Sequence, residues 1–479
     1  MVSGEAEQYD VVVLGGGPTG ENLADRTRAA GLSTVLVESQ LIGGECSYWA
    51  CMPSKALLRP AHALAHARAL PGAREAVTGE LDAAAVLARR DEFTWHWHDD
   101  SQVTWLRDTG IDLVRGHGRL AGERRVEVET PEGVRVLTAR HAVAVCTGSR
   151  AALPPVPGLA EAHPWTSRDA TSSAKVPGRL TVVGGGVVAV EMATAWRALG
   201  SRVTLLVRGG KLLERMEPFA GELVADGLRA AGVDVRLGAE VVRLARQGGE
   251  VTLTLADGSS VAADEVLYAT GRVPRTDDIG LASVGLEPGR WLPVDDSCLV
   301  EGVPGGWLYA AGDVNHRALL THQGKYQARI TGAAIAARAA GEPLDTARWG
   351  AHAASADTAG APQVVFTEPE AAAVGLSLAE AERAGLRVRA VDYELGHVAG
   401  ASLYVDDYRG RARMVVDLDR GVLVGATFVG PGVAELLHSA TVAVVGEVPV
   451  ARLWHAVPAY PTVSEVWLRL LETLRDGVD

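Results

Sequence analysis

Residues 9–20 of this 479-residue chain read YDVVVLGGGPTG, an apolar run that leads directly into a glycine-rich turn. The apolar run predicts a buried strand, and the residues after the turn predict a helix that ends near Ala30. A second predicted strand, Ser33–Val37, ends at Glu38, an acid about 20 residues beyond the glycines. This order of strand, turn, helix and strand is typical of a dinucleotide-binding α/β unit.

The glycines of this turn have separate uses in a nucleotide site. Gly15 permits the tight turn, Gly17 lets a pyrophosphate approach the backbone, and Gly20 lets the helix pack against the strand. The N-terminus of the helix faces the phosphates, and Glu38 is placed to accept a hydrogen bond from a ribose hydroxyl. The first unit therefore predicts one bound dinucleotide.

The same pattern recurs in residues 180–189, which read LTVVGGGVVA. Gly184 and Gly186 occupy the first two glycine positions, and Ala189 replaces the third. A helix is predicted to end near Leu199 and is followed by another strand. The chain therefore carries two dinucleotide units.

The second unit differs from the first at the end of its second strand, where Arg208 stands in place of an acid. Lys211 and Arg215 follow closely. Cations at this point suit the 2′-phosphate of NADP, which an acid would repel. A solvated basic loop is the alternative interpretation. We predict NADPH in this unit.

Composition sets the broad class of the protein. The length suits about three domains, and 47% hydrophobic with 22% charged residues is an ordinary globular balance. The net charge of −13 argues against a nucleic-acid or anionic-membrane partner. No signal peptide or membrane-spanning run is evident, so we expect a cytoplasmic protein. No metal site is predicted.

Two of the four cysteines, Cys46 and Cys51, lie five residues apart in GGECSYWACMPSK, residues 43–55. In a regular helix this spacing gives an axial rise of about 7.5 Å, near the upper limit for a disulfide. A bridge therefore requires irregular backbone between them. The spacing alone leaves two interpretations open, a redox pair and two unrelated buried thiols.

Three further predicted strands end in small or polar residues. The C-terminal region differs from the rest of the chain in its predicted elements. The strand ends are Thr147-Gly148, Thr270-Gly271-Arg272 and Gly312-Asp313. From about Gly350 the sequence predicts an α+β region without phosphate-binding glycine loops, and dimerisation is its expected role. We expect two Rossmann-like, three-layer ββα domains and this α+β domain. The expected segments are 1–155 (FAD), 156–278 (NADPH), 279–348 (FAD and central) and 349–479 (dimerisation).

From about Tyr9 to Leu474 the sequence resembles the flavoprotein disulfide reductases, which include glutathione reductase, dihydrolipoamide dehydrogenase and mercuric reductase. The motifs that carry the resemblance are both glycine fingerprints, GGxCxxxxCxPSK, TGR, GD and, at residues 365–375, VFTEPEAAAVG. The resemblance implies FAD in the first unit, NADPH in the second, and a homodimer. It also implies that Cys46 and Cys51 form a redox-active disulfide, with Cys51 beside the flavin and Cys46 facing the substrate.

The resemblance extends to individual residues. It implies that Lys55 approaches the flavin and pairs with Glu191, and that Asp313 binds the ribityl chain. The residues expected to contact FAD are Gly15, Gly17, Gly20, Glu38, Gly44, Gly118, Thr147, Gly148, Arg272, Gly312, Asp313, Leu320 and Thr321. Those expected to contact NADPH are Gly184, Gly186, Arg208, Lys211, Arg215 and Gly271.

One departure from the family pattern affects the expected substrate. Disulfide reductases of this family carry His-Pro-Thr-x-x-Glu near the C-terminus, and this chain reads Tyr460-Pro461-Thr462-Val463-Ser464-Glu465. Histidine titrates near 6.5 and tyrosine near 10, so a tyrosine is a poor base at neutral pH. Tyr460, His455 and His322 are alternative proton-handling residues. We also predict that the Tyr460–Pro461 bond is cis.

The prediction is an NADPH-dependent FAD enzyme that reduces a small disulfide-type acceptor through Cys46 and Cys51. One alternative is an NAD(P)H–quinone or dye reductase, in which electrons leave directly from the flavin. A second is an enzyme similar to mercuric reductase, although the C-terminal residues lack that family's cysteine pair. A third is a flavoprotein without catalytic activity.

Overall fold

The computed structural model describes residues 6–476. Its contacts divide into two compact units, and both are built from segments distant in sequence. Of the described residues, unit 1 comprises 6–52, 91–150 and 272–358, and unit 2 comprises 53–90, 151–271 and 359–476.

Unit 1 is organised around a seven-stranded sheet. Its parallel part consists of β1 (Glu7–Leu14), β2 (Thr34–Glu38), β3 (Asp112–Arg115), β6 (Gly133–Val145) and β16 (Leu308–Ala310). The first half of β6 also pairs antiparallel with β5 (Arg125–Thr130), which pairs with β4 (His117–Leu120).

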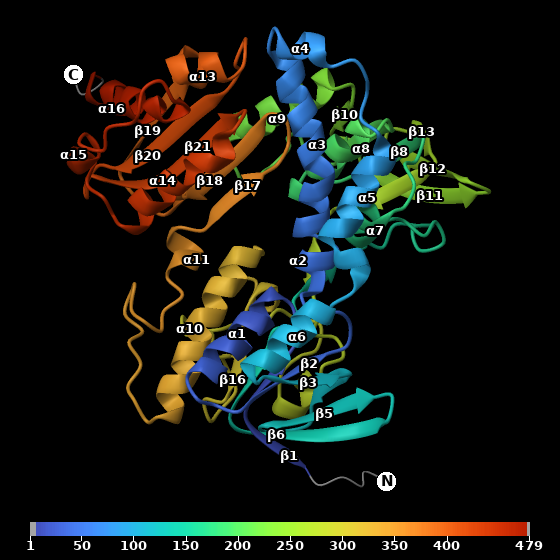
Figure 1. The fold of residues 1–479 in the computed structure, drawn as a ribbon, viewed down its shortest axis with the longest axis vertical. Helices are drawn as coiled ribbons and strands as arrows, with labels where there is room; N and C mark the ends of the chain where they lie inside the picture. Colours follow the sequence, from blue (N-terminus) through green and yellow to red (C-terminus); the bar gives the residue numbers. More distant parts are fainter. Residues whose placement is uncertain (1–5, 477–479) are drawn as a thin grey trace. The chain divides into compact units, whose positions relative to one another are not determined.

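The sequence of β1 shows why this sheet is buried on both faces. Val12 and Leu14 belong to one hydrophobic cluster, and Val11 and Val13 belong to another. A continuous apolar run is what a parallel strand covered on both sides requires. Helices α1 (Pro18–Ala29) and α10 (Thr321–Ala339) pack side by side in this unit, as Figure 1 shows. The strand and helix predicted at 9–30 are therefore confirmed.

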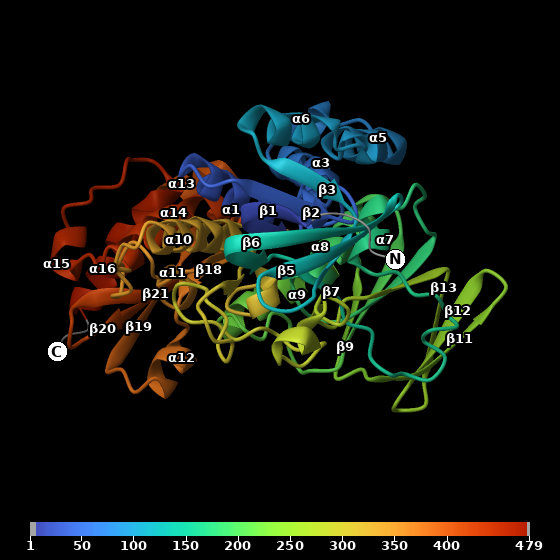
Figure 2. The same ribbon diagram turned by 90° about the horizontal axis from the view of Figure 1, so that it is seen from below.

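Unit 2 contains the second predicted dinucleotide unit as a four-stranded parallel sheet. Its strands are β8 (Arg179–Val183), β9 (Arg202–Val207), β10 (Asp234–Leu237) and β14 (Glu265–Tyr268), and its helices include α8 (Val187–Ala198) and α9 (Pro218–Ala230). Strands β11 (Val241–Gln247), β12 (Glu250–Leu255) and β13 (Ser260–Ala263) form a small antiparallel sheet, labelled in Figure 2.

The C-terminal part of unit 2 is a five-stranded antiparallel sheet. In spatial order its strands are β17 (Pro362–Val365), β18 (Glu370–Gly375), β21 (Val422–Gly430), β20 (Arg411–Asp417) and β19 (Val388–Glu394). Apolar side chains of α14 (Val433–Val445) and α16 (Val466–Asp476) share its core. A 3₁₀ turn, η5 (Val463–Glu465), leads into α16. The predicted cis bond before Pro461 is confirmed.

Helix α3 (Cys51–Ala69) is the longest helix of the N-terminal region. The other helices are α2 (Gly44–Tyr48), α4 (Ala73–Ala76), α5 (Ala83–Phe93), α6 (Asp100–Thr109), α7 (Ser167–Ser172), α11 (Ala356–Ala359), α12 (Leu378–Arg383), α13 (Ala399–Tyr404) and α15 (Val450–Leu453). The remaining short elements are β7 (Ser149–Ala151), β15 (Arg272–Pro274), η1 (Trp95–Trp97), η2 (Leu281–Val284), η3 (Asp313–Asn315) and η4 (Leu395–His397).

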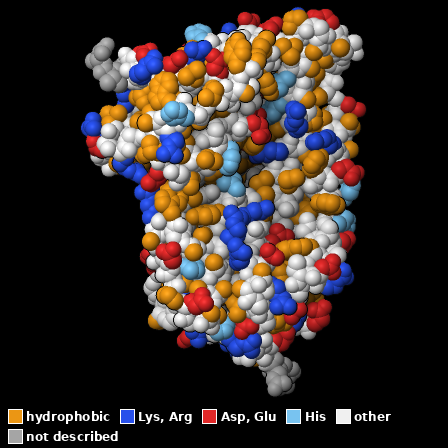
Figure 3. All heavy atoms as spheres, turned by 60° about the vertical axis from the view of Figure 1, so that its left-hand side comes forward, with side chains coloured by type: hydrophobic (Ala, Val, Ile, Leu, Met, Phe, Trp, Pro, Cys, Tyr) orange, Lys and Arg blue, Asp and Glu red, His pale blue; other side chains and the backbone are white. Residues whose placement is uncertain are grey.

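The surface carries both signs of charge. Figure 3 shows acidic, basic and hydrophobic side chains interspersed over the face that it draws. Within residues 6–476, none of the helices is both long enough and apolar enough to cross a bilayer.

Candidate active site

The first glycine turn lies where the carboxyl ends of the parallel strands of unit 1 meet. Gly15 has a φ of +102°, and a side chain on it would meet the carbonyl oxygen of Cys146 at 2.5 Å. Only glycine suits this position, because a residue with a Cβ rarely adopts this φ and its Cβ would clash with the Cys146 carbonyl. A side chain on Gly17, by contrast, would meet nothing within 4 Å. The turn therefore leaves open space beside the N-terminus of α1.

Polar groups around this turn fit a bound dinucleotide. Glu38 accepts hydrogen bonds from the amides of Gly16 (2.7 Å) and Gln40 (2.6 Å), which fix its carboxylate at the end of β2. The hydroxyl oxygen of Thr147 is buried and has no hydrogen-bond partner among the described residues. A buried polar group of this kind normally has a partner. The phosphates and ribose of a dinucleotide would supply acceptors and donors here, so the residues present fit FAD.

The predicted residues near the GD motif are held together by hydrogen bonds. Ser149 Oγ donates to Asp313 Oδ2 (2.5 Å) and accepts from Arg272 Nε (2.5 Å). The sequence did not single out Ser149, which follows the Thr147-Gly148 turn. Arg275, three residues beyond Arg272, pairs with Glu45 at 2.9 Å, and Glu45 directly precedes Cys46. Nothing in the sequence predicts the hydrogen bonds of Ser149 or the ion pair between Arg275 and Glu45.

Cys46 and Cys51 lie on two helices separated by a break. Helix α2 ends at Tyr48, and Trp49 has a non-helical φ of −136° before α3 begins at Cys51. The irregular backbone that the spacing required is therefore present. Both cysteines are free thiols in this structure. Cys51 Sγ lies 3.2 Å from the hydroxyl of Thr321, at the start of α10.

The two thiols affect each other's ionisation. A hydrogen bond with Cys51, then burial, and then the charge of Cys51 hold the pKa of the Cys46 thiol far above its ordinary value. Thr321 and the ammonium of Lys325 act in the opposite direction. Because a negative charge on one sulfur disfavours a second, the reduced pair carries at most one thiolate near neutral pH.

A buried acid near the first turn was not predicted. Burial raises the pKa of Glu21, in the first turn of α1, to about 7; the charge of Lys325 opposes this shift and that of Glu38 adds to it. Glu21 therefore holds a proton more readily than an exposed glutamate does. The only feature of the sequence that could have pointed to Glu21 is its position directly after Gly20.

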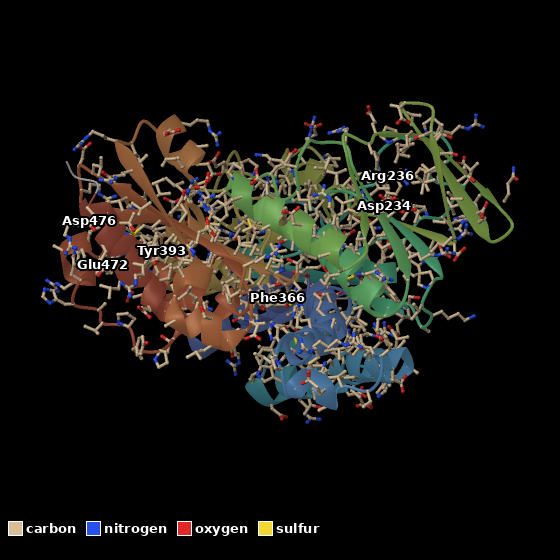
Figure 4. All side chains as sticks on the ribbon, turned by 90° about the horizontal axis from the view of Figure 1, so that it is seen from above. Asp234, Arg236, Phe366, Tyr393, Glu472 and Asp476 are labelled. Carbon is tan, nitrogen blue, oxygen red and sulfur yellow. The ribbon has the colours of Figure 1, made fainter. Side chains whose placement is uncertain are left out.

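Lys55 and Glu191 form the pair that the resemblance predicted. Lys55 Nζ is 2.7 Å from Glu191 Oε2, and the amide of Phe366 donates to Glu191 Oε1 (3.0 Å). The glutamate is 3% exposed. Lys55 Nζ also lies 5.0 Å from the centre of the ring of Phe366, labelled in Figure 4, a cation–π contact. Glu191 thus balances the charge of a lysine whose side chain is itself 35% exposed.

The second glycine turn resembles the first. Gly184 has a φ of +135°, and a side chain on it would meet the carbonyl oxygen of Ala269 at 2.3 Å. Arg208, Lys211 and Arg215 are all exposed in the segment after β9. Three exposed cations at the end of this strand suit a phosphate.

The C-terminal motif is divided between an exposed and a buried residue. Tyr460 is 75% exposed and Glu465 is 6% exposed. Glu465 Oε1 accepts from Arg469 (2.6 Å), while its other carboxylate oxygen is buried without a partner among residues 6–476. His455 and His322 are exposed. The structure therefore does not bring Tyr460 and Glu465 of one chain into hydrogen-bond contact.

The remaining predicted residues lie at glycine positions or at the start of α10. Gly118 is in close contact with Leu14 and Val37, and a Cβ on it would lie 2.8 Å from the Leu14 side chain. Gly44 packs on Gly17, and Leu320 caps α10. Gly20, Gly148, Gly186, Gly271 and Gly312 all lie at turns or helix starts.

Comparison with known families gives two matches along the chain. Residues 9–340 match the family described as "Pyridine nucleotide-disulphide oxidoreductase". Residues 361–470 match the family described as "Pyridine nucleotide-disulphide oxidoreductase, dimerisation domain".

Individual relatives agree with these matches. The chain is 32% identical to a mercuric reductase of Acidithiobacillus ferrooxidans, over 96% of this chain and 82% of that protein. It is 30% identical to dihydrolipoyl dehydrogenase 3 of Pseudomonas aeruginosa, over 96% of both. A Cu(II) complex of the HOCl-induced flavoprotein disulfide reductase RclA from Escherichia coli has the same fold, with a TM-score of 0.83, 22% identity and coverage of 97% and 99%.

Proposed function

The chain belongs to the pyridine nucleotide-disulphide oxidoreductases, and from that premise we propose an NADPH-dependent FAD enzyme that reduces an acceptor through Cys46 and Cys51. The family consists of flavoproteins that use a pyridine nucleotide. The main support for the proposal is the arrangement of Cys46 and Cys51. Two thiols that share a hydrogen bond lie at a helix break, and one of them also contacts Thr321 at the start of α10.

The residues of the chain have distinct proposed roles. Bound FAD would supply two-electron transfer between NADPH and a dithiol. Glu38, Thr147 and Asp313 would hold that cofactor, and Arg208 with Lys211 and Arg215 would bind the 2′-phosphate of NADPH. Lys55 would provide a positive charge that Glu191 keeps in place. Cys46 would act as the thiol that attacks the acceptor.

The proposed assembly is a homodimer with segments 1–155, 156–278, 279–348 and 349–479 as its functional divisions. The match of residues 361–470 to a dimerisation domain supports it. In the dimer, Tyr460 of one subunit would face the thiols of the other, as the family resemblance implies. A tyrosine suits an acceptor whose reduction needs little proton transfer. We propose that the acceptor is either of this kind or a disulfide of unusual type.

Anaerobic titration with NADPH tests the thiol pathway. The wild-type holoenzyme should take up two electrons more per subunit than a Cys46→Ser variant, because a disulfide is a two-electron couple. Cys298→Ala, which removes a thiol outside the pair, should titrate like the wild type. Equal uptake by the wild type and Cys46→Ser would contradict the proposal.

Turnover with a panel of acceptors identifies the substrate class. The panel contains disulfides, quinones, Hg(II) and Cu(II), and each is tested with wild type and Cys46→Ser. Loss of disulfide reduction with retained quinone reduction in Cys46→Ser supports the proposal. Equal retention of both activities would favour the quinone or dye reductase alternative.

A further inference from the structure

Four polar residues of unit 1 form a closed ring of hydrogen bonds. Asp357 Oδ2, on α11, accepts from Gln327 Nε2 on α10 (2.9 Å), and Gln327 Oε1 accepts from Asn315 Nδ2 (2.8 Å). The backbone amide of Arg317 donates to Asn315 Oδ1 (3.0 Å), and the Nε of the same arginine donates to Asp357 Oδ2 (3.0 Å). Figure 1 labels α10 and α11, the two helices that the ring joins.

The carboxylate of the ring is buried among hydrogen-bond donors. The Asp357 side chain is 0% exposed, and Gln327 and Asn315 are also buried. Gln323 Nε2 donates to the other carboxylate oxygen, Asp357 Oδ1, at 3.0 Å. Burial raises the pKa of Asp357, and Arg317 and the two glutamine amides oppose that shift. The guanidinium of Arg317 balances the buried negative charge.

This carboxylate determines which way the Gln327 amide points. The two ends of a glutamine amide are alike in shape, but only the nitrogen can donate a hydrogen bond. Because ionised Asp357 offers acceptors alone, the nitrogen of Gln327 faces it and the carbonyl oxygen faces away. That oxygen accepts from the backbone amide of Gly312 at 2.7 Å. Asp357 therefore fixes the acceptor that the Gly312 amide meets.

Gly312 lies between α10 and the first glycine turn. Its φ is +82°, and a Cβ on it would meet the hydroxyl oxygen of Thr19, in that turn, at 2.7 Å. A Cβ on Gly324 of α10 would lie 3.4 Å from the Cα of Gly312. The next residue is Asp313, which is proposed to hold FAD. The oxygen of Gln327 thus supports the backbone that carries this aspartate.

We propose that Gln327 is a positioning residue for FAD, which holds the Gly312 amide so that Asp313 stays in its binding position, and that Asp357 fixes the orientation of the Gln327 amide. The inference deepens the proposed function and rests on it, because it assumes that Asp313 binds FAD. A binding residue on a turn depends on such support, since turns are less rigid than helices and strands.

Release of FAD from diluted holoenzyme, followed as a rise in flavin fluorescence, tests the role of Gln327. Gln327→Met keeps the length of the side chain but cannot accept from Gly312, so FAD should leave about tenfold faster, the scale of one lost buried hydrogen bond. Gln323→Met makes the same substitution at a residue that contacts the other oxygen of Asp357, and it should release FAD at nearly the wild-type rate. Wild-type release from Gln327→Met, or equal acceleration in both variants, would overturn the proposal.

A double-mutant cycle with Asp313 separates positioning from a general loss of stability. In an Asp313→Asn background, Gln327→Met should accelerate release by less than about twofold, because the carboxylate that it positions is already absent. A substitution that only loosens the fold would act equally in both backgrounds. The same acceleration with and without Asp313→Asn would therefore contradict the proposal.

Asp357→Asn tests the origin of the amide orientation. It keeps the shape of the side chain but replaces one acceptor with a donor, so it should also speed FAD release. Combined with Gln327→Met, it should add less than about twofold to the rate. If Gln327→Met does not fold, Asp357→Asn takes its place in the cycle with Asp313→Asn. Wild-type release from Asp357→Asn would show that the carboxylate does not act in this way.

The Asp313→Asn variant alone distinguishes this inference from the proposed function. If it releases FAD at the wild-type rate, the proposed role of Asp313 is wrong and the inference falls with it. If Asp313→Asn releases FAD quickly while Gln327→Met behaves like the wild type, Asp313 keeps its proposed role and only the inference is wrong.

Discussion

Tyr460 is the residue at which this chain departs from the disulfide reductases that it resembles. Its side chain is exposed, and the glutamate five residues later is held by Arg469 rather than by the phenol. The phenol is thus free to meet a partner subunit or a substrate. What it lacks is the ability of an imidazole to accept a proton near neutral pH.

Replacing Tyr460 with histidine should increase disulfide reduction. General acid–base catalysis contributes about 10²- to 10⁴-fold in enzymes, and we expect at least a tenfold rise in kcat/KM at pH 7 for a disulfide acceptor. Steady-state assays from pH 5 to 9 measure it. His455→Asn should leave the wild-type rate unchanged. A loss of activity in His455→Asn would instead assign proton transfer to His455.

Arg208 should determine the preference for NADPH over NADH. Arg208→Glu places a carboxylate where the 2′-phosphate would bind, so the KM for NADPH should rise at least tenfold while that for NADH changes little. Both constants come from initial rates with each nucleotide. Arg243→Glu makes the same charge change in β11 and should preserve the preference. Equal effects of Arg208→Glu on both nucleotides would exclude the phosphate site.

His62 should make the folded protein less stable in acid. Burial lowers its pKa in the folded state, so the unfolded chain binds the proton first. Stability should therefore fall as the pH drops below about 6.5. Urea unfolding at pH 8 and pH 5 should show a loss of stability in acid that is smaller in His62→Gln than in the wild type. An identical pH dependence in both proteins would contradict this expectation.

At the scale of the element, α16 shows how a helix accommodates a buried acid. Val466, Leu470 and Leu471 are buried on one side. Glu465, just before the helix, is compensated by Arg469 four residues later. The 3₁₀ turn η5 before α16 could not be predicted from the sequence, because apolar periodicity does not distinguish the two kinds of helix.

Removing Arg469 should leave the Glu465 carboxylate buried without a cation. Because Arg469 is itself 37% exposed, solvent screening reduces the cost, and we expect Arg469→Ala to lower the free energy of unfolding by about 1–2 kcal/mol. Urea denaturation measures it. Arg387→Ala breaks an exposed ion pair with Asp419 and should cost less than about 0.5 kcal/mol. Equal losses would show that burial of Glu465 is unimportant.

Elements were predictable from the sequence where local chemistry determines them. The strand, glycine turn and helix of each dinucleotide unit depend on residues close in sequence, and so does the break between Cys46 and Cys51. The partners of Lys55 and His66 on α3 have no local signal, because Glu191 and Glu368 come from segments more than 100 residues away.

At the scale of the whole molecule, the proposed homodimer accounts for exposed apolar side chains in the region that matches a dimerisation domain. The large exposed side chains there are Leu403, Tyr404, Leu418, Val442, Val457 and Tyr460. Which of them meet a second subunit could not be predicted from one sequence, because contacts across a dimer leave no periodic pattern along the chain.

Val457, which is 84% exposed, is expected to lie at the dimer interface. Val457→Asp should weaken dimerisation at least tenfold, because it places a charge against an apolar contact. Sedimentation should show the wild type at twice the mass of the chain and the variant partly at the mass of one chain. Val134→Asp, at an exposed site on β6, should remain dimeric. A wild type that sediments as a single chain would contradict the dimer.

The exposure of the segment around Tyr460 has a consequence for how such a protein diversifies. Residues 455, 456, 459 and 460 are all exposed, so most substitutions there cost little stability. The thiols, Lys55 and Glu191 are fixed by buried or paired contacts, where substitutions cost more. Selection for a new acceptor could therefore act on the surface segment first. An engineer seeking new substrates has the same starting point, a randomised library of residues 455, 456, 459 and 460.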